Sequence, residues 1–103
     1  MDWRKHKSHR EETRAVKKAL IEAGIHPESV GHDRGTAWSW LVINLGPNPS
    51  GLEHVKYGDG WFCVPDCPAC KKNQEIRRKV IRIAQEVTGR HGEYNGEIQV
   101  LMQ

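Results

Sequence analysis

The chain has 103 residues, of which 37% are hydrophobic and 28% are charged, and its formal net charge at pH 7 is +3. This length corresponds to one domain with a single modest core. No apolar run approaches the roughly 20 residues of a membrane-spanning helix. No apolar segment follows the first charged residues, as it would in a secretory signal. We therefore expect a cytoplasmic protein with a polar surface and no membrane partner.

The first predicted element is a helix over about 9–23. Ser8 and Glu11 have the spacing of a capping box, which satisfies the free N–H groups at a helix start. Behind them, apolar residues recur at helical spacing: Val16, Ala19, Leu20 and Ala23. Gly24 and Pro27 end the helix, because glycine adopts the left-handed backbone of a helix terminus and proline prevents continuation.

Two strands are predicted next, a short one around Val30 and a longer one over 36–45. The longer strand is apolar on both faces, which is typical of a central strand. Its two faces carry Trp38, Trp40 and Val42 on one side and Leu41, Ile43 and Leu45 on the other. Glycine and proline residues over 46–51 then predict a loop.

Residues 52–64 have the pattern of a hairpin around the favoured two-residue turn Asp59-Gly60. This register places four pairs of residues opposite one another: Gly58 with Trp61, Tyr57 with Phe62, Lys56 with Cys63, and Val55 with Val64. One face of the hairpin is then apolar and the other mixed, with Val55, Tyr57, Phe62 and Val64 against His54, Lys56, Trp61 and Cys63. A slip of one residue would mix the two sets, so the side-chain pattern favours this register.

A second helix is predicted to start at Pro68 and to end at Gly89. Its apolar stripe consists of Ile76, Val80, Ile83, Ala84 and Val87. After a polar turn region over 90–96, alternation over 98–102 predicts a last strand, which the helical crossover can place parallel to a neighbour. The predicted order is α-β-β-β-β-α-β, an α+β fold with two helices on one face of a small, mainly antiparallel sheet.

The three cysteines of the chain, Cys63, Cys67 and Cys70, lie within eight residues. Three sulfur ligands at this spacing predict a metal site, and zinc prefers four tetrahedral thiolate and imidazole ligands. The odd number of thiols and the missing signal argue against a disulfide framework. We therefore expect a basic tail over 1–7 and a single domain over 8–103. Within that domain, one structural zinc ion per chain would join the hairpin to the start of the second helix.

The sequence leaves the fourth ligand of this site open. The hairpin register places His54 on the face of Cys63, diagonally across the strand pair, so His54 is the first choice. His91 is its rival, although a helix of about 20 residues would hold it roughly 30 Å from Cys70. The remaining candidates are His32, Asp66, a histidine of the tail and a ligand from a partner subunit.

Other chemistries share this cysteine spacing. Radical S-adenosylmethionine enzymes use it, but Ala69 stands where they usually have an aromatic residue, and this chain is too short for their barrel. A three-cysteine iron–sulfur site, a redox pair of Cys67 and Cys70, and packed free thiols remain alternatives. A small metalloenzyme would need an open coordination position and a general base. The H-x-E motif of zinc deaminases and the common nucleotide and hydrolase motifs are missing, so an enzyme is the less favoured reading.

Basic residues concentrate in the tail and again over 71–82, where six Lys and Arg stand against one Glu. Five of them predict phosphate contacts beside the metal site: Lys71, Lys72, Arg78, Lys79 and Arg82. A solvated helix face is the simpler meaning of such a run. The four tryptophans suggest a core, a protein-interaction or dimerisation surface, or side chains that stack on nucleic-acid bases.

Two stretches carry a resemblance to a known group of domains. The stretch VKKALIEAGIHPESVGHDRGTAWSWLVINL, Val16 to Leu45, combines a helix, a short strand and G-T-A-W-S-W-L-V-I, and TGRHGEYNGEIQVL has the same character. Together they resemble small α-β-β domains of phage and conjugative-element proteins, including those associated with large polyvalent proteins. The resemblance covers about half of the chain, without the cysteines. It implies an accessory role in a phage or mobile element and supplies no catalytic residues.

Overall fold

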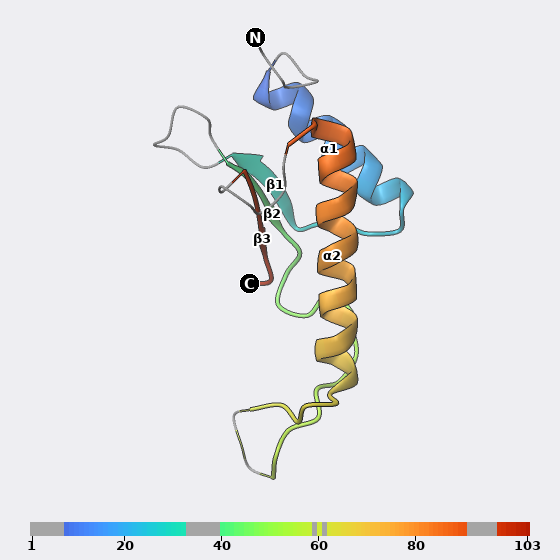
Figure 1. Ribbon diagram of the computed structural model, residues 1–103, viewed down its shortest axis with the longest axis vertical. Coiled ribbons are helices and arrows are strands. Elements are labelled where there is room, and N and C mark those ends of the chain that lie inside the picture. The colour runs from blue at the N-terminus through green and yellow to red at the C-terminus, as the bar shows by residue number, and fades with distance from the viewer. Residues whose placement is uncertain (1–7, 33–39, 59, 61, 91–96) are drawn as a thin grey trace.

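The computed structural model describes residues 8–32, 40–58, 60, 62–90 and 97–103. Its elements follow in the order α1 (His9–Glu22), β1 (Ser29–His32), β2 (Leu41–Asn44), α2 (Pro68–Thr88) and β3 (Ile98–Leu101). The sheet, α1 and the C-terminal half of α2 form a body, and the N-terminal half of α2 extends from it to a loop region (Figure 1). The chain is therefore α+β, as the sequence predicts.

The three strands form one mixed sheet in the order β1-β2-β3. β1 and β2 are antiparallel, with Ser29 opposite Asn44, whereas β2 and β3 are parallel, with Leu41 opposite Ile98. The parallel pair arises because α2 carries the chain back along the sheet before β3 begins. β2 is the central strand, in agreement with its two apolar faces.

The predicted strand count was too high, because the described residues of the segment 52–64 add no strand to the sheet. Its described residues contain one isolated antiparallel bridge, Lys56 with Cys63. Beside this bridge, the N–H of Tyr57 donates to the carbonyl of Phe62 at 3.2 Å. The N–H of Val64 likewise donates to the carbonyl of Val55 at 2.9 Å. These pairs confirm the predicted register, whereas Asp59 of the predicted turn lies outside the described residues. The paired segments stand apart from the sheet, where a two-stranded unit forms only a short ladder.

The strand predicted over 36–45 is shorter in the structure, where β2 begins at Leu41. Residues 33–39 lie outside the described part of the chain, and so do the tail over 1–7 and the predicted polar turn over 91–96. Among the tryptophans, Trp3, Trp38 and Trp61 fall outside it as well, whereas Trp40 is half-buried.

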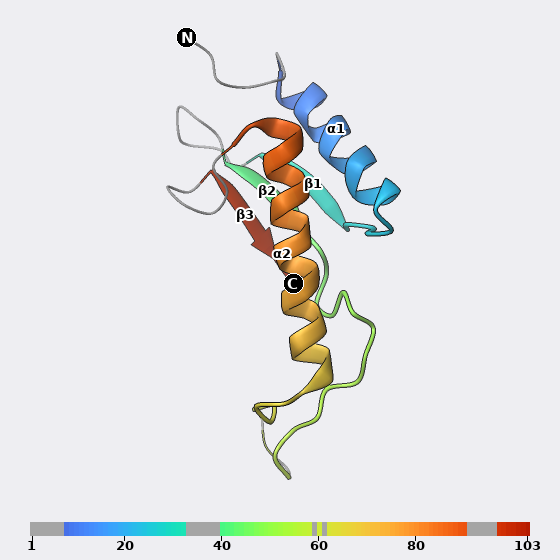
Figure 2. The same ribbon diagram turned by 45° about the vertical axis from the view of Figure 1, so that its right-hand side comes forward.

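One hydrophobic core lies between the sheet and the two helices. Alternate residues of the strands enter it, namely Leu41, Ile43, Ile98 and Val100. They belong to one cluster with Val16 and Leu20 of α1 and with Val80 and Ala84 of α2. Both helices therefore cover the same face of the sheet, as predicted, and Figure 2 shows them side by side there.

The helix ends follow the sequence signals. The Ser8 hydroxyl accepts a hydrogen bond from the N–H of Glu11 at 3.2 Å, which confirms the predicted cap of α1. α2 has Pro68 in its first turn and ends at Gly89, whose backbone φ of 77° is left-handed. The buried stripe of α2 contains Val80 and Ala84, as predicted, and also Ala69, Asn73 and Thr88. Ile76, Ile83 and Val87 pack beside it and are partly buried.

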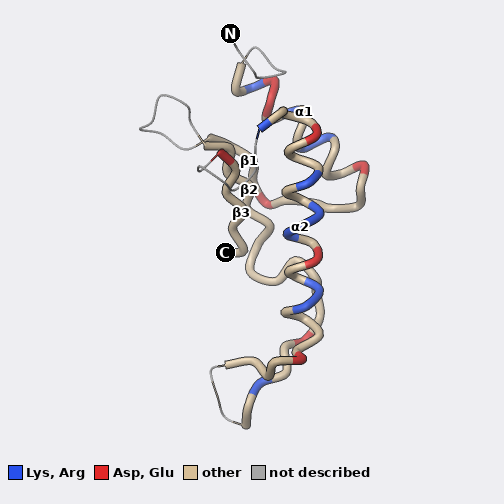
Figure 3. Tube along the Cα trace, in the orientation of Figure 1, with Lys and Arg blue, Asp and Glu red and all other residues tan. Residues whose placement is uncertain are grey.

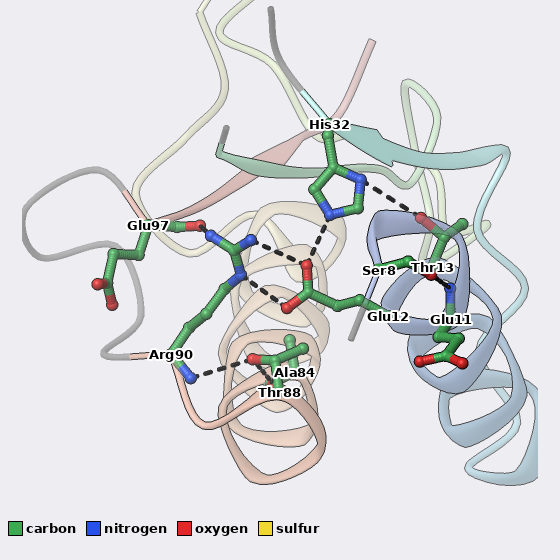
Figure 4. A network of polar contacts seen from close by, with 9 residues as sticks. All are labelled: Ser8, Glu11, Glu12, Thr13, His32, Ala84, Thr88, Arg90 and Glu97. Carbon is green, nitrogen blue, oxygen red and sulfur yellow. Dashed lines mark hydrogen bonds and ion pairs between the residues drawn. The ribbon is translucent and has the colours of Figure 1, made fainter. Parts of the chain in front are cut away.

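A buried polar network joins α1, β1 and the end of α2 (Figure 4). The Glu12 carboxylate, only 2% exposed, accepts hydrogen bonds from Nη2 of Arg90 at 2.8 Å and from its Nε at 3.0 Å. Nε2 of His32 lies 2.6 Å from the same carboxylate. Nη1 of Arg90 also donates to the carbonyl of Glu97 at 3.0 Å. This network links α1, β1 and the segment after α2 by polar contacts, in addition to the apolar core.

Across the described residues, no helix combines the length and the apolar character needed to cross a membrane.

Candidate metal centre

The loop region at the far end of α2 brings His54 and the three cysteines together. Each side chain offers one ligand atom: Nδ1 of His54 and Sγ of Cys63, Cys67 and Cys70. All four atoms lie within 4.8 Å of one another, an arrangement that can hold a metal ion. We call the segment that carries these side chains, residues 52–70, the knuckle.

The distances within this group fit ligand atoms around one ion. Nδ1 of His54 lies 3.3 Å from the sulfur of Cys63, 3.6 Å from that of Cys67 and 3.5 Å from that of Cys70. Tetrahedral zinc, with Zn–S and Zn–N bonds of about 2.3 and 2.0 Å, separates nitrogen from sulfur by about 3.5 Å. One imidazole nitrogen has either one lone pair or one N–H. Hydrogen bonding therefore does not explain three sulfur neighbours, whereas a shared cation does.

Local backbone structure positions each ligand. The bridge between Lys56 and Cys63 sets the hairpin register, which brings His54 diagonally onto the face of Cys63. A turn then leads into α2, with the N–H of Cys67 donating to the carbonyl of Val64 at 3.0 Å. Cys67 is the residue that precedes α2, and Cys70 lies in its first turn. The hairpin and the helix start therefore meet at the four ligand atoms.

The thiols have different acidities. Burial raises the pKa of Cys67, but hydrogen bonds from the backbone N–H groups of Cys70 and Val55 lower it, to about 6. The N–H of Val55 lies 3.3 Å from this sulfur. Hydrogen bonds with Cys63 and Cys67 raise the pKa of Cys70 to about 11. The Cys67 thiol therefore ionises before that of Cys70, and a bound cation would favour ionisation of its ligands, because metal ligation requires the thiolate form.

The other candidates for the fourth ligand lie elsewhere. The Asp66 side chain is 92% exposed, and its Oδ1 pairs with Nζ of Lys71 at 3.3 Å. His32 belongs to the buried network with Glu12. His91 and the tail histidine fall outside the described residues. Among the described candidates, only His54 joins the cysteines.

The five basic residues predicted to contact phosphate are all exposed on α2. Blue segments in Figure 3 mark Lys and Arg positions along this helix. Nζ of Lys71 pairs with Asp66, and Nζ of Lys72 lies 3.4 Å from the carboxylate of Glu75. Surface pairs of this kind contribute at most about 1 kcal/mol, so both lysines can exchange their partners for a phosphate.

Asn73 anchors the base of the knuckle, a role that the sequence analysis missed. Its side chain is buried, and its Oδ1 accepts a hydrogen bond from the N–H of Ser50 at 2.8 Å. Its Nδ2 donates to Oδ1 of Asn48 at 2.9 Å. The loop that leads into the knuckle is thereby fastened to α2. The available signal was a polar residue at helical spacing between Ala69 and Val80.

Replacement of this anchor should destabilise the protein. We expect Asn73→Ala to lower the free energy of unfolding by about 1–3 kcal/mol, because the N–H of Ser50 loses its partner in a partly buried place. Urea unfolding measures this change. Gln74→Ala is the matched control, since Gln74 is the exposed neighbour on the same helix and should change stability by less than about 0.5 kcal/mol. Equal effects of the two substitutions would contradict the role of Asn73.

No protein-family model, curated protein or solved structure matches this chain. The chemistry of the centre therefore follows from its own residues and geometry.

Proposed function

We propose that this chain is a small nucleic-acid-binding module whose knuckle is held by one structural zinc ion. The observation that carries the proposal is the meeting of four zinc-type ligand atoms at the start of a basic helix. Four protein ligands complete a tetrahedral shell, and closed shells of this kind are typical of structural zinc. A hydrolytic zinc keeps one position for water, which the ligand set His54, Cys63, Cys67 and Cys70 does not leave.

An iron–sulfur cluster suits the same geometry less well. Such a cluster places several iron and sulfide atoms between its cysteine ligands, which holds the thiolates apart. Here all four ligand atoms lie within 4.8 Å of one another, as around a single ion. The mixed imidazole and thiolate set also agrees with zinc. Zinc is therefore the metal that we propose.

The nucleic-acid part of the proposal rests on α2. Five of its six basic residues are exposed, and the first of them is Lys71, immediately after the last metal ligand. In such a module, zinc fixes the start of the helix, and the helix presents its cations to a phosphate backbone. An accessory role of this kind in a phage or mobile element, which the sequence resemblance implies, remains a prediction.

The proposal is tested by metal analysis and by salt-dependent binding. We expect one zinc per chain, and binding of a labelled oligonucleotide, followed by fluorescence anisotropy, that weakens steeply as salt rises. The Arg78→Ala/Lys79→Ala double variant should lower the logarithmic salt slope by about 1–2, because each phosphate contact contributes roughly 0.7–0.9.

The Lys17→Ala/Lys18→Ala double variant is the matched control for charge. These two lysines are also adjacent and exposed, but they lie on α1, outside the basic run of α2. The control should bind nearly as the unmodified protein does. Equal weakening in both double variants would show that binding depends only on the net charge of the protein. No binding at low salt would overturn the proposed function.

A further inference from the structure

The knuckle carries an apolar surface that no other described residue covers. Val55 is 47% exposed, Tyr57 56% and Phe62 78%, and Val64, on the same side, is half-buried. We call these four residues the aromatic face. Tyr57 and Phe62 are cross-strand partners, joined by the hydrogen bond from the N–H of Tyr57 to the carbonyl of Phe62. Two exposed aromatic side chains thus come from paired positions of the hairpin.

The position of the metal centre explains this exposure. His54 and Cys63 lie on the opposite side of the hairpin, because successive residues of a strand alternate between its faces. The hairpin also lies beyond the end of the sheet, away from the body (Figure 1). Ligand contacts order the hairpin from one side, and its other side is left open. Contiguous exposed apolar surface of this kind usually marks a binding site.

We infer that the aromatic face is a stacking platform for the bases of single-stranded nucleic acid. This inference rests on the proposed function and deepens it by naming the form of nucleic acid. Flat aromatic side chains stack on any base, but only where the base is unpaired and turned outwards. In a duplex the base faces are already stacked on one another, which leaves Tyr57 and Phe62 without a partner.

The charges beside the aromatic face favour this occupant. A shallow groove of about 390 Å³ begins at Pro65, the residue after Val64, and continues along α2 past Lys71 and Arg78. Lys71 and Arg78 are two helical turns apart and therefore share one side of the helix. Glu75 also lines this groove, but its carboxylate pairs with Lys72. A strand whose bases stack on the face can thus lead its phosphates into a basic groove.

The same charges argue against a second copy of this chain as the occupant. Each copy would bring its own run of six Lys and Arg against one Glu to the contact. Like charges brought together in this way are unfavourable. A single strand of nucleic acid can contact both surfaces, because its bases stack on the aromatic face and its phosphates pair with the cations of the groove.

The test compares single-stranded and duplex DNA on the zinc-loaded full chain. The probes are labelled oligothymidylate and its duplex with oligoadenylate, at one fixed salt concentration. We expect the single strand to bind about tenfold more tightly, or better, because stacking adds to the phosphate contacts. Phe62→Leu and Tyr57→Leu should each weaken single-strand binding about fivefold or more while leaving duplex binding unchanged.

Two controls keep the test decisive. Phe62→Trp retains a stacking surface and should retain affinity, whereas Ile21→Ala removes an exposed apolar side chain from α1 and should have no effect. Zinc content is measured for every variant. If Phe62→Leu loses zinc, Phe62→Trp and Tyr57→Leu decide the outcome.

Several results would overturn the inference. Equal affinity for single strand and duplex, or unchanged binding by both leucine variants, would exclude stacking. If the Arg78→Ala/Lys79→Ala variant still loses binding in that case, the proposed function survives without the platform. A dimer by size-exclusion chromatography that Phe62→Leu converts to monomer would assign the face to a second copy. Absence of any binding at low salt would remove both proposals.

Discussion

Removal of the metal by a strong zinc chelator is expected to unfold the knuckle and leave the body folded. Structural zinc contributes about 10–16 kcal/mol of apparent binding free energy in small zinc domains, and there it is folding free energy. The knuckle has little else to hold it, because its described residues 52–58 are all exposed. The core cluster of the body takes no residue from the described positions 46–75. The two parts should therefore respond separately.

Residue-resolved hydrogen exchange measures this separation. Amides of the knuckle and of the first turn of α2 should lose protection in chelator, whereas those of β2, β3 and the C-terminal half of α2 should keep it. Added zinc should restore the first group. Unfolding of the whole chain would show that body and knuckle form one cooperative unit, and an unchanged pattern would show that the cysteines hold no metal.

Cys67→Ser should reproduce the chelated state without a chelator. Cys67 is the fully buried ligand, and its sulfur also accepts the N–H of Val55. Asp66→Asn is the control, because this neighbouring carboxylate lies outside the ligand group and its loss should leave one zinc per chain. Loss of zinc in Asp66→Asn would call for a different ligand set.

Among single substitutions outside the apolar core, the loss of Arg90 is expected to destabilise the body most. Arg90→Met leaves the Glu12 carboxylate buried without its guanidinium, and breaking a buried pair in this way costs about 3–5 kcal/mol. Urea unfolding measures the loss. The double variant Glu12→Leu/Arg90→Met should recover part of it, since the unpaired charge is then gone. Glu22→Gln, at an exposed position of α1, should stay within about 0.5 kcal/mol.

The same network gives the protein a defined sensitivity to acid. Burial by itself raises the pKa of Glu12. Hydrogen bonds from His32 and Arg90 outweigh this effect and lower the pKa from 4.5 to about 2. The folded pKa lies below the unfolded one, so the unfolded state binds the proton first. The contribution of Glu12 is therefore complete above about pH 4.5 and is lost as the pH falls toward 2. Glu12→Gln should flatten the decline of stability in this window, and a decline as steep as in the unmodified protein would contradict the assignment.

The features that the sequence predicts well are local. The cap at Ser8, the end of α2 at Gly89 and the hairpin register each depend on residues a few positions apart. The group of His54 and the three cysteines belongs to the same class, because the register brings His54 to Cys63 and the turn into α2 places Cys67 and Cys70 beside them. Alternating polarity predicts that two segments pair, but not that the pair joins a larger sheet. The sequence therefore predicts the hairpin but not its separation from the sheet.

The features that the sequence does not predict are long-range polar contacts. Glu12 and Arg90 are 78 positions apart, and in sequence Glu12 is indistinguishable from a solvated acid in the first turn of a helix. Asn73 likewise interrupts an apolar stripe, and its loop partners lie 23 and 25 positions earlier. Burial of such residues is decided by the packing of distant segments, which no local pattern records.

The connection between β2 and α2 is pinned at Asn73 and, with a metal bound, also at His54 and the three cysteines. These pins divide a long crossover into short closed segments of chain. The entropy of closing a loop rises slowly with its length, by about 0.6 kcal/mol for each doubling. A change in length at the tip of the hairpin therefore costs the body little in loop entropy, because Asn73 and its loop partners lie outside the hairpin. It would shift the register that brings His54 to Cys63, since loop length fixes the register of a hairpin. The length of the tip is thus constrained by the metal group and not by the body.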